Sequence, residues 1–406
     1  MQLARKFYAS LTLKPQGATM IVAGFLPVFA IIAMFPVVAA IIQHFKDVPD
    51  AAIRVPAMVT APGYAIAVLA PFAGLFVDRF GRRPLLLACT FFYGIVGTLP
   101  FFLENLDVIF ASRLLLGVCE AGILTIVNTL IADYWEDGER RTWLMLQGLV
   151  GPLFQSLVFL LVAAVAAWRW NGSFLVYLVA LPIFVAMYLC IFEPRHPDQQ
   201  AATVGPAAAT AASDERFPMA TAILVGSLTL FCSMLYYVFI VNGSIAWAEV
   251  GVTNPMAVSK ATFVPSFFIL AGSILFRIVS RYSNAVQIAT FLLFFALGLG
   301  GVGLAHNVVQ MQVALVLQQT GAGMAVPALI AWSQTKFSFR HRGRGMGVWT
   351  SCFFLGQAVS PILVGLAART LGSMQMAFLA AGAIALVAAA MGALLAMRRQ
   401  PMPLPA

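Results

Sequence analysis

Residues 74–84 read Gly-Leu-Phe-Val-Asp-Arg-Phe-Gly-Arg-Arg-Pro and connect two long apolar runs, residues 51–77 and 84–103. Each run is long enough to cross a bilayer, because about 20 helical residues span a hydrocarbon core roughly 30 Å thick. A short basic segment between two such runs is typical of a loop at a membrane surface. This stretch therefore predicts two transmembrane helices joined by a short charged loop.

Similar apolar runs continue along the chain and determine its fold class. Of the 406 residues, 61% are apolar and 10% are charged, whereas about a quarter of the residues of a soluble domain are charged. Barrel strands would be about 10 residues long with alternating polarity, and these runs do not alternate. We predict an all-α membrane protein with twelve transmembrane helices, at residues 18–43, 51–77, 84–103, 107–135, 142–167, 173–192, 218–247, 258–280, 286–305, 308–335, 345–369 and 374–397.

A polar segment divides these helices into two sets of six. Residues 193–217 contain prolines, an Ala-rich run and a charged triplet, a composition typical of a solvated linker. This predicts an N-terminal six-helix bundle at residues 1–192, a cytoplasmic linker, and a C-terminal six-helix bundle at residues 218–406. Residues 272–281, Gly-Ser-Ile-Leu-Phe-Arg-Ile-Val-Ser-Arg, are a weaker copy of the opening stretch at the matching place in the second half. Internal repeats of this kind recur in secondary transporters.

Basic residues indicate which side of the membrane holds the termini. An even number of spans places both termini on one side, and 18 of the 24 Lys and Arg residues lie on that side. Five lie on the opposite side, at Lys46, Arg54, Arg169, Lys260 and Arg369, and Arg113 lies within a helix. Because cytoplasmic loops are enriched in Lys and Arg, we predict cytoplasmic termini in a cell membrane, with a bacterial inner membrane as the expected location. The net charge of +9 then reflects topology and contact with anionic lipid, not a nucleic-acid partner.

Several other classes of site are excluded by the pattern of polar residues. The first apolar run is long enough to remain as a helix, so we expect no cleavable signal peptide. The five Cys residues are scattered singly in apolar runs, and the four His residues form no cluster, so neither a metal site nor a cofactor site is expected. No nucleophile with a neighbouring base is evident, and an enzyme is therefore not expected.

The stretch at residues 74–84 resembles the signature that the major facilitator superfamily carries between its second and third helices, G-x-x-x-D-R-x-G-R-R. Arg113, Gly117 and Gly122 are also similar to the R-x-x-x-G-x-x-x-x-G pattern of that family's fourth helix. The resemblance covers practically the whole chain. It implies a twelve-helix secondary active transporter that works by alternating access and is similar to the drug:proton antiporters, with a small-molecule substrate and protons as the coupling ion, and we expect it to act as a monomer.

The resemblance also implies a cytoplasmic gate, in which the loop Asp pairs with an acid that ends the fourth helix and an Arg that opens the eleventh. The positions that match are Gly74, Asp78, Arg79, Gly81, Arg82, Arg83, Asp133 and either Arg342 or Arg344. For the basic residues, a role in topology is an equal alternative. For Asp78 a gate is the better interpretation, because an acidic residue gains nothing from the positive-inside rule. Phe276 stands at the matching position of the second copy, which predicts a weaker contact between the two bundles there.

Two departures from the drug-antiporter pattern count against a generic multidrug transporter. That pattern has a Gly-Pro motif and then a pair of glycines in the fifth helix. Here Gly148, Gly151 and Pro152 are followed by Leu-Phe-Gln-Ser. Multidrug members also often place an acid in the first helix, and residues 20–42 contain no carboxylate.

Arg113 and Glu120 are the two ionisable residues placed clearly inside a predicted span. Burying such a group at mid-bilayer costs about 2.5 to 3.5 kcal/mol, so each needs a partner or a function. Seven residues are nearly two helical turns, so the two side chains share one helix face. One hypothesis is that Glu120 takes up and releases a proton next to Arg113 during transport. The alternative is a permanent ion pair that holds the fourth helix to its neighbours.

Other polar residues within the spans are candidates for contact with the substrate, although such residues often serve as hydrogen-bonding links between helices. They are Asn128, Gln147, Gln155, Tyr236, Tyr237, Asn242, Gln318, Gln319 and Gln357. Asn242 is followed by Gly243 and Ser244, where the helix backbone could open to line a cavity.

The function predicted from these observations is proton-coupled export of an amphipathic small molecule, a drug or a metabolite, because an apolar cavity with few charges suits such a solute. One alternative is uptake or exchange, by symport, of an organic anion bound by Arg113. A membrane receptor or scaffold that does not transport is the alternative from another class.

Overall fold

The computed structural model describes residues 15–72, 80–135, 143, 150–151, 154, 157–166, 168–193, 217–338 and 341–398. The side chains of Asn128, Ala132, Asp133, Arg342, Gly343 and Arg398 are not included in this description.

All the elements described are helical, and they form two groups in chain order. The N-terminal group comprises α2 (Pro15–Gly24), α3 (Leu26–Ile32), η1 (Phe35–Val37), α4 (Val38–His44), α5 (Ala51–Leu69), α7 (Arg82–Thr98), η2 (Leu99–Phe102), α8 (Leu106–Tyr134), an apolar helix at Leu157–Ala166, η3 (Gly172–Val179) and α10 (Ala180–Cys190). The C-terminal group comprises α13 (Met219–Glu249), α14 (Pro255–Ser266), α15 (Phe268–Val279), α16 (Asn284–Gly303), α17 (Val308–Lys336), α18 (Arg342–Leu371) and α19 (Met374–Arg398).

The predicted fold class is confirmed. Eleven helical segments of the described chain are long and apolar enough to cross a membrane. The shorter helix Leu157–Ala166 lies within the span predicted at residues 142–167, most of whose other residues are outside the description. The bounds of several spans agree closely with prediction, as in α17, which was predicted at residues 308–335.

The first span, predicted at residues 18–43, is observed at Pro15–His44 but is interrupted along its length. It consists of α2, α3, η1 and α4 in succession. Pro27 stands at the start of α3, and Pro36 stands in η1. A proline removes one backbone donor and its ring clashes with the preceding turn, so it bends or interrupts a helix. The eighth span is divided in a similar way, because α14 ends one residue after Pro265.

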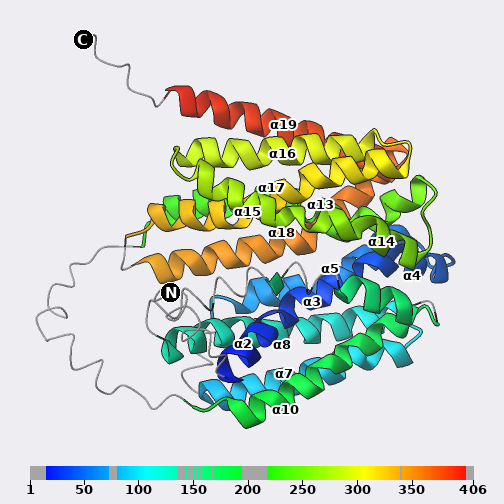
Figure 1. The fold of residues 1–406 in the computed structure, drawn as a ribbon, viewed down its shortest axis with the longest axis vertical. Helices are drawn as coiled ribbons and strands as arrows, with labels where there is room; N and C mark the ends of the chain where they lie inside the picture. The colour runs from blue at the N-terminus through cyan, green and yellow to red at the C-terminus, as the bar shows by residue number, and fades with distance from the viewer. Residues whose placement is uncertain are drawn as a thin grey trace, which may run out of the picture.

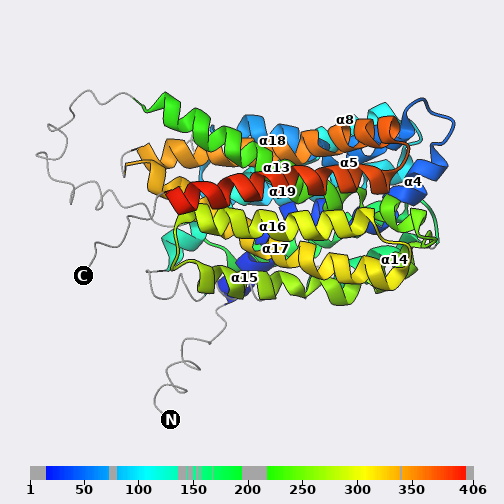
Figure 2. The ribbon, with the colours of Figure 1, turned by 90° about the horizontal axis from the view of Figure 1, so that it is seen from above.

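The two groups lie side by side with their helices running roughly in one direction. Figure 1 shows the N-terminal group, coloured blue to green, below the helices α16, α17 and α19 of the C-terminal group. Figure 2 shows the same common helix direction from above. The groups meet along α5 and α18, which are close neighbours. We call the end that holds Pro15, Glu193, Phe217 and Lys336 the terminal face, and the opposite end the far face.

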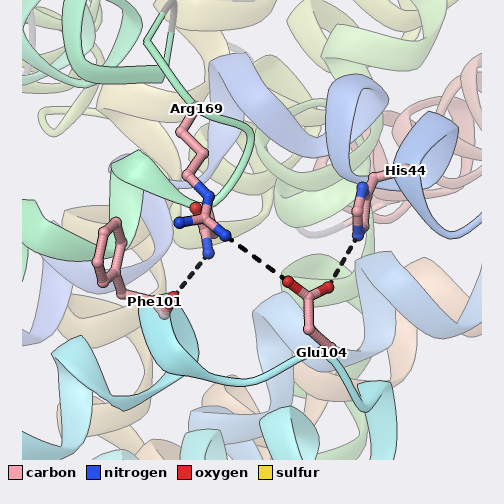
Figure 3. A network of polar contacts seen from close by, with 5 residues as sticks. His44, Phe101, Glu104 and Arg169 are labelled. Atoms are coloured by element: carbon pink, nitrogen blue, oxygen red, sulfur yellow. Dashed lines mark hydrogen bonds and ion pairs between the residues drawn. The ribbon is translucent and has the colours of Figure 1, made fainter.

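The far face of the N-terminal group is tied together by a polar network (Figure 3). Glu104, between η2 and α8, lies 3.2 Å from Nε2 of His44 and 3.8 Å from Nη2 of Arg169. The His44 ring stacks on Trp170 at 4.0 Å between centroids. Three connections that are distant in sequence are therefore joined at one point.

One ion pair at the far face connects the two groups. Nη1 of Arg369, near the end of α18, lies 2.9 Å from Oδ1 of Asp50, which precedes α5. Asp50 has a positive φ of 56°, a left-handed conformation that an Asp adopts more readily than most residues. This turn directs the chain from the first span into α5 where the two groups meet.

Two glutamates cap the N-termini of helices that are far away in sequence. The carboxylate of Glu193 accepts hydrogen bonds from the backbone N–H groups of Arg82 and Arg83, at 2.8 and 2.6 Å, at the start of α7. In the C-terminal group, Glu249 accepts from the backbone N–H groups of Met374 and Gln375, at 2.7 and 2.8 Å, at the start of α19. A carboxylate in this position satisfies unpaired donors and complements the positive end of the helix dipole.

Candidate functional site

A cavity of about 310 Å³ lies between the two groups and is the candidate binding site. Its walls come from the first span and α8 of the N-terminal group, from the helix Leu157–Ala166, and from α13, α14, α15, α17 and α18. The lining is mainly aliphatic and aromatic and consists of Pro27, Val28, Ile31, Ile32, Phe35, Leu124, Phe159, Tyr236, Tyr237, Phe239, Ile240, Thr262, Ile269, Gln319, Ala322, Val326, Phe353, Phe354 and Gln357. A second cavity of about 240 Å³ shares six lining residues with it, Val28, Ile32, Tyr236, Ile269, Ala322 and Val326.

Helical spacing brings the lining residues to the cavity. On α13, Tyr236 and Ile240 are four residues apart and therefore share a helix face, as do Phe353 and Gln357 on α18. On the first span, the interruption at Pro36 places Phe35 in η1. The Phe35 ring lies 5.4 Å from that of Phe239 across the boundary between the groups.

The aromatic rings of the cavity wall form two clusters, one around Phe353 and one around Phe35. Phe353 lies 5.8 Å from Tyr236 and 5.6 Å from Tyr237, measured between ring centroids. Phe35 also lies 5.1 Å from Phe159. Aromatic pairs at such distances prefer tilted or edge contacts and add specific geometry to the apolar surface. The cavity therefore offers ring faces and edges to an occupant.

The polar part of the lining is small and uncharged. It consists of the amides of Gln319 and Gln357 and the hydroxyl groups of Tyr236, Tyr237 and Thr262. None of the described residues that line the cavity is Asp, Glu, Lys, Arg or His. Such a site can hold an apolar body and orient it with a few hydrogen bonds. Among the residues described, no group of three or more His, Cys, Asp or Glu could hold a metal ion.

Arg113 lies inside the N-terminal group and is absent from the lining of the central cavity. Its side chain is buried, and Nη2 donates a hydrogen bond to the carbonyl oxygen of Gly97 at 2.7 Å. The guanidinium carbon lies 5.0 Å from the ring centroid of Phe174 and 4.9 Å from that of Tyr177. These rings and the carbonyl hold the cation between α7, α8 and η3, where cation–π contacts are strong because water is excluded.

Glu120 is equally buried and lies behind the cavity wall. It is 1% exposed, and its Oε1 has no hydrogen-bond partner in the described part of the chain. It makes no ion pair with Arg113 there either, although the two interact electrostatically. Leu124, one helical turn further along α8, does line the cavity. Glu120 is also within electrostatic range of Tyr237, a lining residue on α13.

The predicted substrate-contact residues have different positions in the structure. Tyr236, Tyr237, Gln319 and Gln357 line the central cavity. Asn242 and Gln318 are buried but do not line it. The side chain of Asn128, and all of Gln147 and Gln155, fall outside the described residues.

The helix backbone does not open at Gly243, contrary to our prediction. Helix α13 continues without interruption from Met219 to Glu249. A Cβ added to Gly243 would lie 2.7 Å from the ring of Phe239 and 2.8 Å from the ring of Phe35. The glycine is needed because two aromatic rings pack against the helix backbone at this point.

The predicted gate is described only in part. Gly74, Asp78 and Arg79 lie outside the described residues, as do the side chains of Asp133 and Arg342. Gly81 has a φ of 80° before α7, and the two arginines that follow it donate their backbone N–H groups to Glu193. The guanidinium of Arg344 lies 4.6 Å above the ring of Phe217. The proposed pairing of Asp78 therefore stays a prediction.

Sequence reasoning missed most of the aromatic wall and both glutamate caps. Phenylalanine is so frequent in the chain, with 33 residues, that Phe35 or Phe353 does not stand out. A usable signal was Pro36, because a helix interruption in mid-span often borders a cavity. For Glu193 no local signal exists, since its partners are more than 100 residues away.

The family model described as Major Facilitator Superfamily matches residues 20–304 and 268–405. Solute carrier family 22 member 22 of Mus musculus is 33% identical over 130 residues, which are 32% of this chain and 22% of that protein. Efflux pump dotC of Dothistroma septosporum is 30% identical over 118 residues, which are 26% of this chain and 19% of that protein. These matches span only about a fifth of the length of the curated relatives.

Solved structures with the same fold cover almost the whole chain. The crystal structure of a D-xylose-proton symporter superposes with a TM-score of 0.74 at 13% sequence identity, over 93% of this chain and 96% of that one. At this identity the likeness is one of fold.

Proposed function

From the premise that this chain belongs to the Major Facilitator Superfamily, we propose that it exports an amphipathic small molecule by alternating access, driven by protons. The chain is a multi-pass membrane transporter and not an enzyme. The observation that supports it best is the uncharged, aromatic cavity between the two helix groups.

The lining chemistry supports an amphipathic substrate. A cavity of about 310 Å³ is at the lower end of the usual range for small-molecule sites. A sugar would need a dense set of hydrogen-bonding partners, whereas this lining supplies two amides and three hydroxyl groups among aliphatic and aromatic side chains. An aromatic body with one or two polar substituents matches that balance.

Uptake of an organic anion receives less support from the same geometry. That alternative depends on Arg113 as the anion-binding residue. Arg113 is 1% exposed and is held by Gly97, Phe174 and Tyr177 within the N-terminal group. An anion in the central cavity would find no cationic side chain among the described lining residues.

Glu120 is our candidate for the proton carrier. Its carboxyl is buried, its Oε1 has no hydrogen-bond partner in the described part of the chain, and it shares a helix face with the buried Arg113, so its charge depends on what surrounds these two groups. A small change in the position of either group can therefore change proton occupancy. Its place behind Leu124 and near Tyr237 puts this proton beside the substrate cavity.

We also propose the topology and the gate predicted from the sequence. The basic residues favour a terminal face in the cytoplasm and a far face outside the cell, in a bacterial inner membrane. Two bundles at residues 1–192 and 218–406, joined by the linker 193–217, would rock about the cavity as a monomer. Asp78, with Asp133 and Arg342 or Arg344, would close the terminal face.

A proteoliposome experiment tests this proposal. Purified protein is reconstituted with an imposed pH gradient, and the movement of a panel of neutral, cationic and anionic aromatic amphiphiles is followed together with internal pH. We expect wild-type protein to move a neutral or cationic aromatic amphiphile against its own concentration gradient, driven by protons that move down the imposed pH gradient in the opposite direction. Glu120→Gln should abolish uphill transport yet retain substrate exchange across the membrane. Glu104→Gln, a change at an exposed carboxylate of the far face, is the matched control and should transport normally.

Three outcomes would contradict the proposal. Unchanged uphill transport by Glu120→Gln would exclude Glu120 as the proton carrier. Transport of anions alone would favour the organic-anion alternative. Binding of an amphiphile without any exchange by the wild-type protein would indicate a receptor and not a transporter.

A further inference from the structure

A groove of about 930 Å³ on the C-terminal group is larger than the central cavity of about 310 Å³. Its walls come from α13, α16, α17 and α19, and it reaches the terminal face at Lys336 and at the turn between α15 and α16. It shares no residue with the central cavity. The transport mechanism proposed above does not use it.

One part of the groove is strongly apolar and accessible from the side of the bundle. The side chains of Leu224 on α13 and of Ile384, Val387, Met391 and Leu395 on α19 are between 53% and 62% exposed and line it. On α19 these residues recur every three to four positions, so they form one continuous stripe along the helix. In a bilayer such a stripe faces acyl chains.

The other part of the groove, at the terminal face, is polar and positively charged. Lys336 lines it, and its Nζ lies 6.0 Å from the ring centroid of Trp332, which also lines it. Arg281 stands between the lining residues Ser280 and Tyr282, with its guanidinium 5.0 Å from the Tyr282 ring. Neither cation forms an ion pair with any residue that the structure describes.

The start of α16 adds to this positive end. Asn284 and Ala285, the first residues of α16, line the groove, and Asn284 also donates a hydrogen bond to Thr335, next to Lys336. The N-terminus of a helix carries partial positive charge and favours a phosphate. No acid of the described residues lines the groove to neutralise these charges.

We infer that this groove binds one phospholipid with an acidic headgroup. The phosphate sits at Lys336 and the start of α16, and an acyl chain lies along the stripe on α19. Charge complementarity selects the lipid, because an anionic headgroup is attracted by unpaired Lys and Arg near the membrane surface. The cation–π contacts with Trp332 and Tyr282 keep both cations at the rim of the groove.

Native mass spectrometry of the purified full chain tests this inference. The protein is titrated with dioleoyl phosphatidylglycerol or with dioleoyl phosphatidylcholine, and the dissociation constant of the first bound lipid is measured. We expect phosphatidylglycerol to bind more tightly. Lys336→Ala should weaken its binding roughly fivefold, since one basic residue near the surface contributes on that order. Lys336→Arg should keep the affinity for phosphatidylglycerol. Phosphatidylcholine binding should change little in either variant.

Two further variants separate the parts of the site. Lys260→Ala removes an exposed lysine of the same group at the far face and should leave phosphatidylglycerol binding unchanged. Val387→Trp fills the apolar part of the groove and should weaken the binding of both lipids. Equal binding of the two lipids, or equal losses in Lys336→Ala and Lys260→Ala, would overturn the inference. A dimer that dissociates in Val387→Trp would instead show that a second copy of the chain covers the groove.

Discussion

The ion pair between Asp50 and Arg369 joins the two helix groups at the far face, and its removal is the sharpest test of how that face closes. Nη1 of Arg369 lies 2.9 Å from Oδ1 of Asp50. One residue belongs to each group, so the pair has to break when the groups separate at this face. The change Arg369→Gln removes the charge and keeps a side chain of similar length. We expect it to raise the population open at the far face.

The size of the effect follows from the exposure of the pair. The two side chains are 68% and 56% exposed, and exposed ion pairs contribute about 0.2 to 1 kcal/mol. The ratio of closed to open protein should therefore fall by roughly 1.4- to 5-fold in Arg369→Gln. Asp50→Asn should give a similar change, and the double variant should add little to either single one. At 1 M salt, where the Debye length is about 3 Å, wild-type protein should approach the variants.

The assay measures the separation of the groups at the far face. Spin labels on Lys46→Cys and Thr253→Cys, in a background without the native cysteines, report the distance between an exposed position of each group. Arg54→Gln is the matched control, because it breaks an ion pair with Asp107 that lies at the same face but within the N-terminal group. The reasoning would be refuted if Arg54→Gln shifted the distance distribution as much as Arg369→Gln. It would also be refuted if the shifts caused by Asp50→Asn and Arg369→Gln added up in the double variant.

Other predictions concern packing, capping and the cavity. Gly323→Ala should lower the free energy of unfolding by about 1 to 3 kcal/mol, because the new Cβ would lie 1.9 Å from the Ile269 carbonyl oxygen on α15. Gly300→Ala is the control and should be nearly neutral, because a Cβ there would have no atom within 4 Å. Thermal unfolding in detergent compares the two variants. Glu249→Ala should cost about 0.5 to 2 kcal/mol in the same assay by removing the acceptor for two N–H groups of α19, and an unchanged midpoint would argue against capping. Phe353→Ala should weaken substrate binding in an equilibrium binding assay, because it removes a ring that contacts Tyr236 and Tyr237, whereas Phe91→Ala, at an exposed ring on α7, should not.

The helices could be predicted from the sequence because the bilayer imposes their length and polarity. The span predicted at residues 374–397 is observed as α19 at Met374–Arg398. Such agreement needs no knowledge of neighbouring helices, since each span must satisfy its own backbone in lipid. The interruptions of the first span at Pro27 and Pro36 were not predicted. Both prolines lie in a continuous apolar run, and hydropathy does not register a missing backbone donor.

The environment of the charged pair could be predicted only in part. The seven-residue spacing placed Arg113 and Glu120 on one face of α8, and both are buried. Spacing does not show which neighbour that face meets. The contacts of Arg113 with Gly97 and Tyr177 come from α7 and η3, and they follow from tertiary packing that no local pattern encodes. The cavity lining depends in the same way on how five or more helices converge.

The separation of the charges from the cavity limits how a proton could drive transport in the proposed mechanism. Because no ionised side chain of the described lining faces the cavity, a neutral substrate cannot displace the proton by direct competition for a charge. Coupling then requires that the proton and the substrate favour different arrangements of the same helices. A ligand shifts a conformational equilibrium only through its different affinities for the two conformations. Leu124 on α8 and Tyr237 on α13 line the cavity and lie near Glu120 from opposite groups. Movement of one group against the other therefore changes the surroundings of the carboxyl and the shape of the cavity together, which is the linkage that coupled transport needs.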